Sequence, residues 1–317
     1  MSATLQHVAP SGLLIIDKPQ GVTSFDAVAA VRAALHIKKV GHAGTLDPMA
    51  TGALVIAFGH ATRLLASIVE HDKTYEATIR LGRRTTTDDA EGDFIDANGD
   101  TVDADTPLSR AVTERLARID KNRLREVIAT HFIGDIMQVP STFSAIKVNG
   151  RRAYDLARDG KDVELKSRKV TISEFAVLGV ETAAAGESGG HEGRSAMDHE
   201  QVSASSGVNQ CLDVRVRVSC SSGTYIRALA RDLGNELGVG GYLTRLRRTR
   251  VGRFALPDDT SGVLDDAAMK ETRKHTVTAH TETKTFTNRE GETITRNKCV
   301  LDMPGVAPTG TPLAAAA

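Results

Sequence analysis

The stretch Gly41-His42-Ala43-Gly44-Thr45-Leu46-Asp47-Pro48 places a single carboxylate, that of Asp47, in a polar loop. A carboxylate of ordinary acidity is ionised at neutral pH, so it can act as a nucleophile without a general base. The alternative is structural, because aspartate suits the N-cap of a helix and proline suits the first helical position. Asp47 would then cap a helix that begins at Pro48. These eight residues alone leave both interpretations open.

Residues on both sides of this loop predict buried strands and a capped helix. Residues 12–17 and 53–58 are apolar runs of the length of a buried strand. Thr23 and Asp26 have the spacing of a capping box, which predicts the start of a helix. In residues 73–81, apolar and polar side chains alternate as they do in a strand with one buried face. Further strands are predicted at residues 170–175 and 212–218, and helices at residues 108–132, 153–158 and 226–237, the last of them capped by Thr224.

The charges of the chain are balanced in number but unevenly distributed. Lys plus Arg number 40 and Asp plus Glu number 40, so net charge alone does not indicate a polyanion-binding protein. Residues 211–254 nevertheless carry nine arginines against three acids, which is typical of a surface that binds a polyanion. The alternative is an ordinary solvated face. Residues 85–105 carry eight acids and no base, and we expect them to form a hairpin on the surface, away from any polyanion.

The sequence lacks the features of a membrane protein, a secreted protein and a metalloprotein. No segment approaches the roughly 18 consecutive apolar residues of a membrane span, and residues 1–7 lack the regions of a signal peptide, so we expect a cytoplasmic protein. Cys211, Cys220 and Cys299 cannot all pair, and their spacing is not that of a zinc or redox site. We therefore expect reduced thiols, no metal and no organic cofactor.

The composition changes twice along the chain. Residues 183–210 are rich in Gly, Ser, Glu and His and poor in large apolar side chains, which predicts a flexible insertion. Residues 255–317 are polar and rich in threonine, without a strong core pattern. We therefore predict a main domain over residues 1–254, which includes the insertion, and a small C-terminal appendage over residues 255–317.

Five blocks of unusual composition carry a resemblance to a known family. They are the loop at residues 41–48, Lys18-Pro19-Gln20-Gly21-Val22-Thr23-Ser24, Lys73-Thr74-Tyr75, Phe143-Ser144-Ala145-Ile146-Lys147 with Tyr154, and Ser221-Ser222-Gly223-Thr224-Tyr225-Ile226-Arg227 followed by Leu246-Arg247-Arg248. In this order they resemble the bacterial tRNA pseudouridine synthases of the TruB family, which isomerise uridine 55 in the TΨC loop. The resemblance extends from about Gly12 to Phe254.

The resemblance implies a fold and a domain organisation. The expected fold is α+β, with a mixed, largely antiparallel central sheet flanked by helices. Residues 1–254 would be the catalytic domain. Many family members carry an RNA-binding PUA domain after it, so residues 255–317 would be a short or divergent PUA-like domain or would be partly disordered.

The resemblance assigns the chemistry to three residues. Asp47 would be the nucleophile that adds to the substrate and leaves again, and the sequence leaves open whether it attacks C1′ of the ribose or C6 of the base. Arg227 lies in the first turn of its predicted helix, where a cation opposes the helix dipole unless an anion lies beside it. The resemblance implies that this anion is Asp47; the alternatives are a phosphate contact and an ordinary surface arginine. Tyr75 would pack against the target uracil and assist proton transfer at C5; the alternative is a core tyrosine at the start of a strand.

Other residues are implied in holding the extruded base and the tRNA backbone. Tyr225 and Leu246 would complete the wall of the base pocket, and His42 would occupy the space that the extruded base vacates. A lone loop histidine is otherwise usually a polar surface group. The candidates for contacts with phosphates are Lys18, Lys147, Arg152, Arg247 and Arg248.

The sequence therefore predicts a monomeric enzyme that binds the TΨC stem-loop of tRNA and isomerises uridine 55 by base flipping and aspartate catalysis. Two alternatives stay open. One is a noncatalytic tRNA-binding or RNA-folding module that keeps the pocket for recognition, and the other is a pseudouridine synthase that acts on another RNA, such as large-subunit rRNA. One departure from the family pattern is Ser141, which follows Pro140 where a second proline is common.

Overall fold

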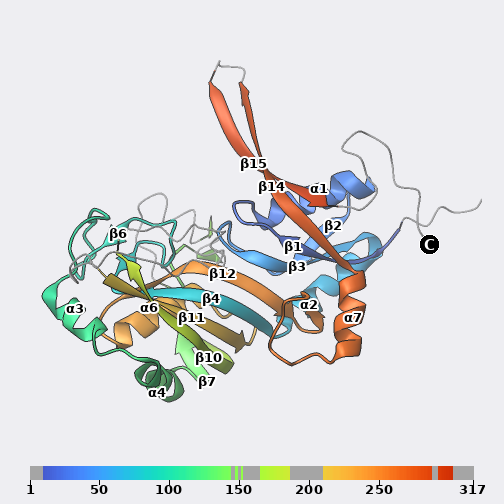
Figure 1. The fold of residues 1–317 in the computed structure, drawn as a ribbon. Coiled ribbons are helices and arrows are strands. Elements are labelled where there is room, and N and C mark those ends of the chain that lie inside the picture. Colours follow the sequence, from blue (N-terminus) through green and yellow to red (C-terminus); the bar gives the residue numbers. More distant parts are fainter. Residues whose placement is uncertain are drawn as a thin grey trace, which may run out of the picture. The chain divides into compact units, whose positions relative to one another are not determined.

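The computed structural model describes residues 10–143, 147–148, 151–152, 165–185, 210–287 and 292–302. The chain forms two compact units, of which unit 1 contains residues 1–74 and 247–317 and unit 2 contains residues 75–246. It passes from one unit to the other within two continuous strands, β4 (Lys73–Leu81) and β12 (Gly241–Val251) (Figure 1).

Unit 1 is built on a mixed sheet. Its further elements are β1 (Gly12–Lys18), α1 (Ser24–Leu35), β2 (Val40–Ala43), β3 (Thr51–Phe58), the 3-10 helix η1 (Gly59–Leu64), α2 (Leu65–Glu70), β13 (Phe254–Ala255), α7 (Asp266–Lys274), β14 (Thr276–Thr287) and β15 (Thr293–Asp302). The strand order is β15-β14-β1-β3-β12, with β2 paired to β3 and β13 paired to β12. The β1–β14 and β3–β12 pairs are parallel, whereas β1–β3, β2–β3 and β14–β15 are antiparallel.

Helix α1 fixes the entry to the first functional loop. The Thr23 hydroxyl accepts a hydrogen bond from the backbone N–H of Asp26, and the Asp26 carboxylate accepts one from the backbone N–H of Thr23. This is the predicted capping box, and it satisfies two N–H groups that a helix start leaves without partners. Val28 and Val31 bury the inner face of the helix, and Ser24 reaches across to the backbone of Leu46.

Unit 2 has a strand order of β12-β4-β11-β10-β7. Its further elements are β5 (Arg84–Thr85), β6 (Phe94–Ile95), α3 (Arg110–Leu116), α4 (Lys121–His131), β7 (Gly134–Gln138), β8 (Lys147–Val148), β9 (Arg151–Arg152), β10 (Arg168–Ala184), β11 (Gln210–Cys220) and α6 (Ile226–Glu236). The β10–β11 and β7–β10 pairs are antiparallel. Helix α4 packs against β10 and α6. Within the described ranges, the molecule has no helix that combines the length and the apolar composition needed to cross a bilayer.

The predicted fold class and most predicted elements are confirmed. The main sheet is mixed and mostly antiparallel, and helices pack on it. Strand β4 has the predicted bounds, and Tyr75, Ala77, Ile79 and Leu81 are all buried, but the strand does not have a single buried face, because Thr74 and Arg80 on the opposite face are buried as well. The strands predicted at residues 12–17, 53–58, 170–175 and 212–218 lie within β1, β3, β10 and β11.

Several predictions about the elements need correction. The single helix predicted over residues 108–132 is two helices, because Asp120 accepts a hydrogen bond from the N–H of Arg123 and starts α4 as a new N-cap. The helix predicted at residues 153–158 lies outside the described residues. So does most of the predicted insertion, of which the described ends belong to β10 and β11 and pair with each other.

The segment after residue 254 belongs to unit 1. Strand β14 pairs in parallel with β1 at Ile15, Ile16 and Asp17, and β15 extends the sheet beyond it. The predicted boundary at residue 254 does not coincide with the division into units, since residues 1–74 and 247–317 form one compact body. These strands are rich in threonine and most side chains of β15 are exposed, so no strong apolar pattern marks them in the sequence.

Candidate active site

The Asp47 loop follows β2 and precedes β3 in unit 1. Gly44 turns the chain out of β2 with a φ of 84°, a backbone conformation that favours glycine. Asp47 is half-buried, and its carbonyl accepts a hydrogen bond of 3.0 Å from the N–H of Ala50. The residues after it form a turn that leads directly into β3, so the alternative in which Asp47 caps a helix starting at Pro48 is wrong.

Two buried cations hold the backbone of this loop. The Lys18 ammonium is fully buried and donates to the carbonyl oxygens of Val22 at 2.8 Å and Pro48 at 3.4 Å. Arg248 is also buried, with 1% of the residue exposed. Its guanidinium donates to the carbonyl oxygen of Ala53 at 2.8 Å and to the carbonyl oxygen of Gly44 at 3.0 Å. Buried carbonyls need donors, and these side chains supply them.

The burial of these two cations corrects a prediction. Lys18 and Arg248 were expected to contact phosphates, but a fully buried ammonium and a fully buried guanidinium do not reach a polyanion outside the protein. The phosphate contact of Arg247 stays a prediction, and within the protein this residue is paired with acids. Its guanidinium forms a bidentate pair with Asp17, with both distances 2.9 Å, and a second pair with Asp258 at 2.6 Å, so two carboxylates already occupy it.

The two remaining candidates for phosphate contacts lie on a short hairpin. Lys147 and Arg152 are paired residues of β8 and β9. Their side chains lie outside the described part of the structure, so their role as phosphate contacts stays a prediction.

His42 lies on β2 opposite Ile56 of β3. Its Nδ1 atom is buried and has no hydrogen-bond partner among the described residues. Burial and then the Arg248 charge lower the pKa of His42, while a hydrogen bond with the Gly44 backbone opposes them. His42 is therefore a neutral imidazole at neutral pH, unlike a solvated surface histidine that titrates nearby.

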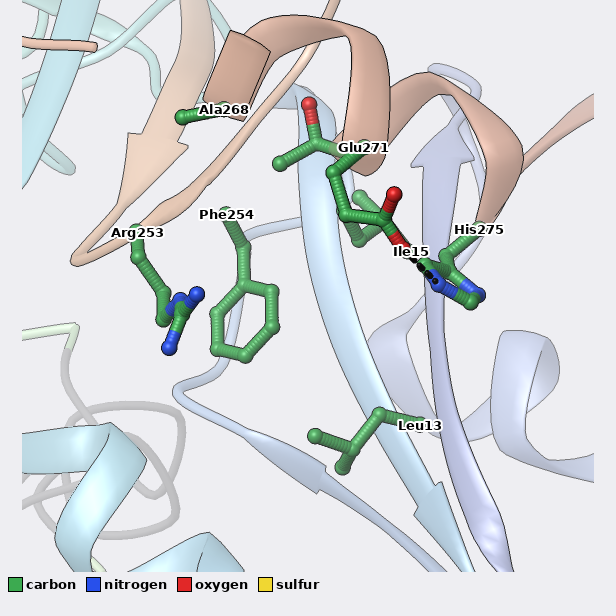
Figure 2. Close-up of a pocket in the computed structure, with 8 residues that line it drawn as sticks. Leu13, Ile15, Arg253, Phe254, Ala268, Glu271 and His275 are labelled. Atoms are coloured by element: carbon green, nitrogen blue, oxygen red, sulfur yellow. Dashed lines mark hydrogen bonds and ion pairs between the residues drawn. The ribbon is translucent and has the colours of Figure 1, made fainter.

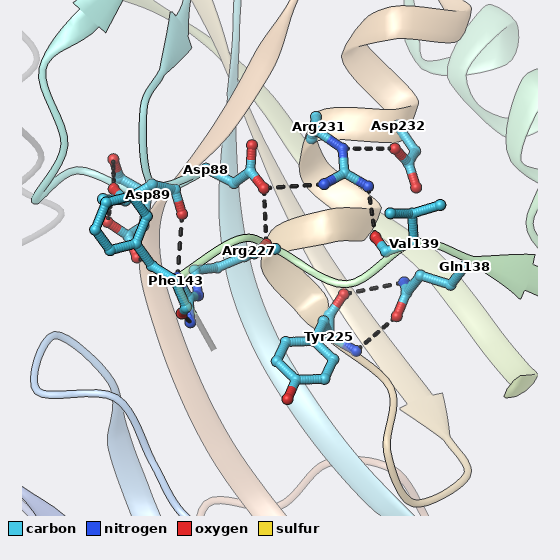
Figure 3. Close-up of polar contacts among 11 residues, drawn as sticks. Asp88, Asp89, Gln138, Val139, Phe143, Tyr225, Arg227, Arg231 and Asp232 are labelled. Atoms are coloured by element: carbon cyan, nitrogen blue, oxygen red, sulfur yellow. Dashed lines mark hydrogen bonds and ion pairs between the residues drawn. The ribbon is translucent and has the colours of Figure 1, made fainter. Parts of the chain in front are cut away.

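Arg227 lies in the first turn of α6 in unit 2, as predicted (Figure 3). The N-cap of this helix is Tyr225 and not Thr224, whose hydroxyl donates to the Ser221 carbonyl instead. The amide group of Gln138 stands in for a side-chain cap. Its oxygen accepts from the N–H of Tyr225 at 2.8 Å, and its nitrogen donates to the Tyr225 carbonyl at 3.1 Å.

A buried acid lies beside Arg227. The guanidinium is 3.3 Å from the Asp89 carboxylate, and 6% of the arginine side chain and 3% of the aspartate side chain are exposed. The guanidinium also donates to the carbonyl oxygens of Thr87 at 3.1 Å and Phe143 at 2.7 Å. An anion was expected at this position because a cation in the first turn opposes the helix dipole.

Sequence reasoning missed Asp89 as a site residue. It placed the whole acidic run at residues 85–105 on the surface, whereas Asp89 is among the most buried charged residues. The available signal was the need of Arg227 for an anion, with the acidic run as the densest source of acids in the chain. The predicted pair of Asp47 with Arg227 stays a prediction.

The other predicted pocket residues fall in unit 2. Tyr75 on β4 and Leu246 on β12 are buried, and Tyr225 is half-buried. The Arg168 guanidinium lies over the Tyr225 ring at 5.2 Å from its centroid, which fixes the ring by a cation–π contact. Tyr75, Tyr225, Arg227 and Leu246 thus belong to unit 2, whereas His42 and Asp47 belong to unit 1.

Each unit also has a cavity that these residues do not line. In unit 1, a cavity of about 370 Å³ lies between α7 and β1. Figure 2 shows the contact between Glu271 and His275 at its edge, where a carboxylate oxygen and Nε2 are 3.3 Å apart. In unit 2, a cavity of about 550 Å³ lies between α3, the segment before β5 and the Gly238–Gly240 turn. Neither contains a predicted catalytic residue, so neither is the candidate active site.

Comparison with known proteins places the chain among RNA-modifying enzymes. A model of the TruB family pseudouridylate synthase N-terminal domain matches residues 32–109 and 95–226, and a model of the tRNA pseudouridylate synthase B C-terminal domain matches residues 227–281. A protein named tRNA pseudouridine synthase B from Bifidobacterium longum (strain NCC 2705) is 67% identical over 307 residues, which are 94% of this chain and 78% of that protein. One of the same name from Mycobacterium sp. (strain KMS) is 48% identical over 247 residues, 78% of this chain and 69% of that protein.

Solved structures give weaker matches. The crystal structure of a Cbf5-Nop10-Gar1 complex aligns with a TM-score of 0.49 and 27% identity, and the structure of an H/ACA RNP bound to a substrate RNA containing 2′-deoxyuridine aligns with a TM-score of 0.45 and 26% identity. The alignments cover 80% of this chain and 51% and 50% of those chains, so this chain spans about half of their length.

Proposed function

The chain belongs to the TruB family of pseudouridylate synthases, and from this membership we propose that it converts uridine 55 in the TΨC loop of tRNA to pseudouridine. The observation that carries the proposal is the match of both family models, which together span residues 32–281 and include Asp47, Tyr75 and Arg227. The enzyme is an isomerase. We propose that it acts as a cytoplasmic monomer on tRNA without a metal or an organic cofactor.

Asp47 is the proposed nucleophile. In the reaction, the bond between N1 of uracil and C1′ of ribose breaks, and a bond between C5 and C1′ forms. The proton on C5 is released, and N1 takes up a proton, so the base is isomerised without a net gain or loss of atoms. The Asp47 carboxylate adds to C1′ or to C6 and leaves as the new bond forms, which returns it to its starting state.

The rigidity of the Asp47 loop supports this role. Arg248 donates to the carbonyl of Gly44 at 3.0 Å and to that of Ala53 at 2.8 Å, on either side of the nucleophile, while the Lys18 ammonium makes only a long contact of 3.4 Å with the carbonyl of Pro48. A reacting group that is held in position reacts faster than a mobile one, because its orientation is paid for during folding. The loop thus has the fixed geometry that a nucleophile requires.

Arg227 is the proposed partner of the Asp47 carboxylate. A guanidinium offers five N–H donors in a plane, and those of Arg227 lie close to Asp89, Thr87 and Phe143. The buried Asp89 neutralises the arginine before the substrate binds and fixes its plane. An arginine held in this way would orient the carboxylate of Asp47 through a bidentate pair.

The base pocket is proposed to contain Tyr75, Tyr225 and Leu246. A uridine in a folded loop has to leave its stack before it can react, which costs a few kcal/mol. Aromatic and apolar walls that stack on the extruded base recover part of that cost. His42 is proposed to fill the vacated space in the RNA. Its neutral state suits this role, because an uncharged imidazole can stack on bases without the cost of burying a charge.

The deciding experiment measures the release of tritium from tRNA that is labelled at C5 of uracil. We expect release from wild type and from Asp105→Asn, an exposed charge-removing control, and none above background from Asp47→Asn. Substituting cytidine for uridine 55 in the tRNA should abolish release. Turnover that survives in Asp47→Asn would refute the mechanism, release from a labelled rRNA fragment but not from tRNA would favour the rRNA enzyme, and tight tRNA binding without release would favour the noncatalytic module.

A further inference from the structure

Arg227 depends on two segments that have little regular structure. Two of its acceptors, the Thr87 carbonyl and the Asp89 carboxylate, belong to the turn that follows β5, and the third is the Phe143 carbonyl in the segment after β7. The position of the Arg227 guanidinium therefore depends on the positions of these two segments. Further contacts are needed to keep both segments packed against α6.

Arg231 contacts the same two segments from the next turn of the same helix (Figure 3). Its Nη1 atom donates to the Asp88 carboxylate at 3.1 Å, and its Nη2 atom donates to the Val139 carbonyl at 2.7 Å. Its Nε atom donates to Asp232, also on α6, at 2.8 Å, which fixes the plane of the guanidinium. Residues four apart lie on one face of a helix, so Arg231 stands beside Arg227.

Asp88 joins the two segments to each other. The oxygen that accepts from Arg231 also accepts from the hydroxyl of Ser141 at 2.7 Å. Ser141 is fully buried, so this hydrogen bond lies out of contact with solvent. The backbone of Asp88 has a φ of 61°, in the left-handed region, which aspartate and asparagine adopt more readily than most other residues with a side chain.

We propose that Arg231 and Asp88, with Ser141, are positioning residues that lock residues 87–89 and 139–143 onto α6 and thereby set the orientation of the Arg227 guanidinium. The proposal rests on the proposed function, because it gives these residues a role in the same reaction. They do not contact the reacting atoms. They act through the acceptors of Arg227.

Two cations, Arg231 and Arg227, and one acid, Asp232, act on the carboxyl group of Asp88. Burial raises the pKa of Asp88, and Arg231, Ser141 and Arg227 lower it, while Asp232 raises it slightly further. The net shift is upward, so the carboxyl takes up a proton at a higher pH than an exposed aspartate does. Protonation removes the charge that attracts Arg231. The lock therefore weakens on the acidic side.

The test compares Arg231→Ala, Arg231→Lys and Asp88→Asn with Arg123→Ala, which removes an exposed ion pair on α4 and serves as the control. The substrate is full-length tRNA labelled with tritium at C5 of uracil. Three quantities are measured: the single-turnover rate constant at saturating enzyme, the Kd for tRNA, and the melting temperature. The rate constant is measured between pH 5.5 and 8.

We expect Arg231→Ala to lower the single-turnover rate constant by about 10-fold to 100-fold, as a misplaced catalytic group does, and to change the Kd by less than about 3-fold. Arg231→Lys should recover part of the rate, since an ammonium can still pair with Asp88. Asp88→Asn should keep the left-handed backbone, which asparagine tolerates, and should reduce the loss of rate at acidic pH relative to wild type. Arg123→Ala should match wild type.

The proposal would be overturned if Arg231→Ala, Arg231→Lys and Asp88→Asn all had the wild-type rate constant. It would also be overturned if the rate constant fell and the Kd rose by equal factors. If Arg231→Ala does not fold, Arg231→Lys and Asp88→Asn decide the question by the same split between rate and affinity. Failure of the proposed function has a different signature, since wild type itself would then release no tritium from uridine 55. Activity in wild type with no effect of the lock variants contradicts the positioning role alone.

Discussion

Replacing Arg248 by methionine should destabilise unit 1 and disorder the Asp47 loop. The arginine donates at 2.8 Å to the carbonyl of Ala53 and at 3.0 Å to that of Gly44, and a contact of 3.5 Å to the Thr45 carbonyl is too long to count. Hydrogen bonds that involve a charged group contribute about 1.5–3 kcal/mol each, so the two good bonds account for about 3–6 kcal/mol. Methionine fills similar space and removes a buried charge, which offsets part of this loss.

We expect the free energy of unfolding of Arg248→Met to fall by about 3 kcal/mol, measured by urea denaturation. The single-turnover rate should fall by about 10-fold to 100-fold, because the segment before Asp47 loses its anchor. Arg253→Met, an exposed site in the turn after β12, is the control and should leave both quantities unchanged. A variant with wild-type stability and wild-type rate would refute the idea that satisfied carbonyls hold this loop. A less stable variant with an unchanged rate would refute only the link to Asp47.

Three further outcomes are expected. NMR should show that the pKa of His42 lies below the value of about 6.5 that is usual for histidine. Because the unfolded chain then binds this proton more readily than the folded protein, the free energy of unfolding should fall as the pH drops through about 6.5. His42→Gln should abolish this pH dependence. Asp213→Ala should lower the free energy of unfolding by about 2–4 kcal/mol in urea, since it leaves the buried Arg80 without its bidentate partner at 2.7 Å, and an unchanged midpoint would contradict this reasoning. Thr23→Ala should cost about 1 kcal/mol by removing half of the capping box with Asp26, whereas Thr23→Ser should cost much less.

The features that the sequence predicted correctly are those set by near neighbours in the chain. The alternation in β4 and the spacing of Thr23 and Asp26 depend on residues that are two to four positions apart, and both were recognised. The break between α3 and α4 was missed, although Asp120 is a good N-cap, because apolar residues continue on both sides of it. Local patterns therefore located most strands and helices but not every boundary.

The depth of charged residues could not be read from the sequence. Asp89 is buried, yet it lies in an acidic segment whose composition is typical of a surface. Its burial depends on a partner far away in the chain, Arg227. Lys18 is buried at the end of the apolar strand β1, where its ammonium donates mainly to the nearby carbonyls of Pro19 and Val22. A charged residue next to a motif is thus a site candidate from sequence, but whether it meets solvent, a carbonyl or a counter-charge requires the fold.

The same argument changes the meaning of the basic segment at residues 211–254. Most of its nine arginines are engaged within the protein: Arg215, Arg217, Arg227, Arg231 and Arg247 are paired with acids, and Arg248 and Arg250 are buried against backbone and hydroxyl oxygens. An arginine that already has a carboxylate partner displaces fewer counterions from RNA than a solvated one, because its charge is already compensated. The composition of this segment therefore overstates its attraction for a polyanion. Several of its arginines instead fix the loops around the candidate site, and affinity for RNA has to come largely from cations outside this set.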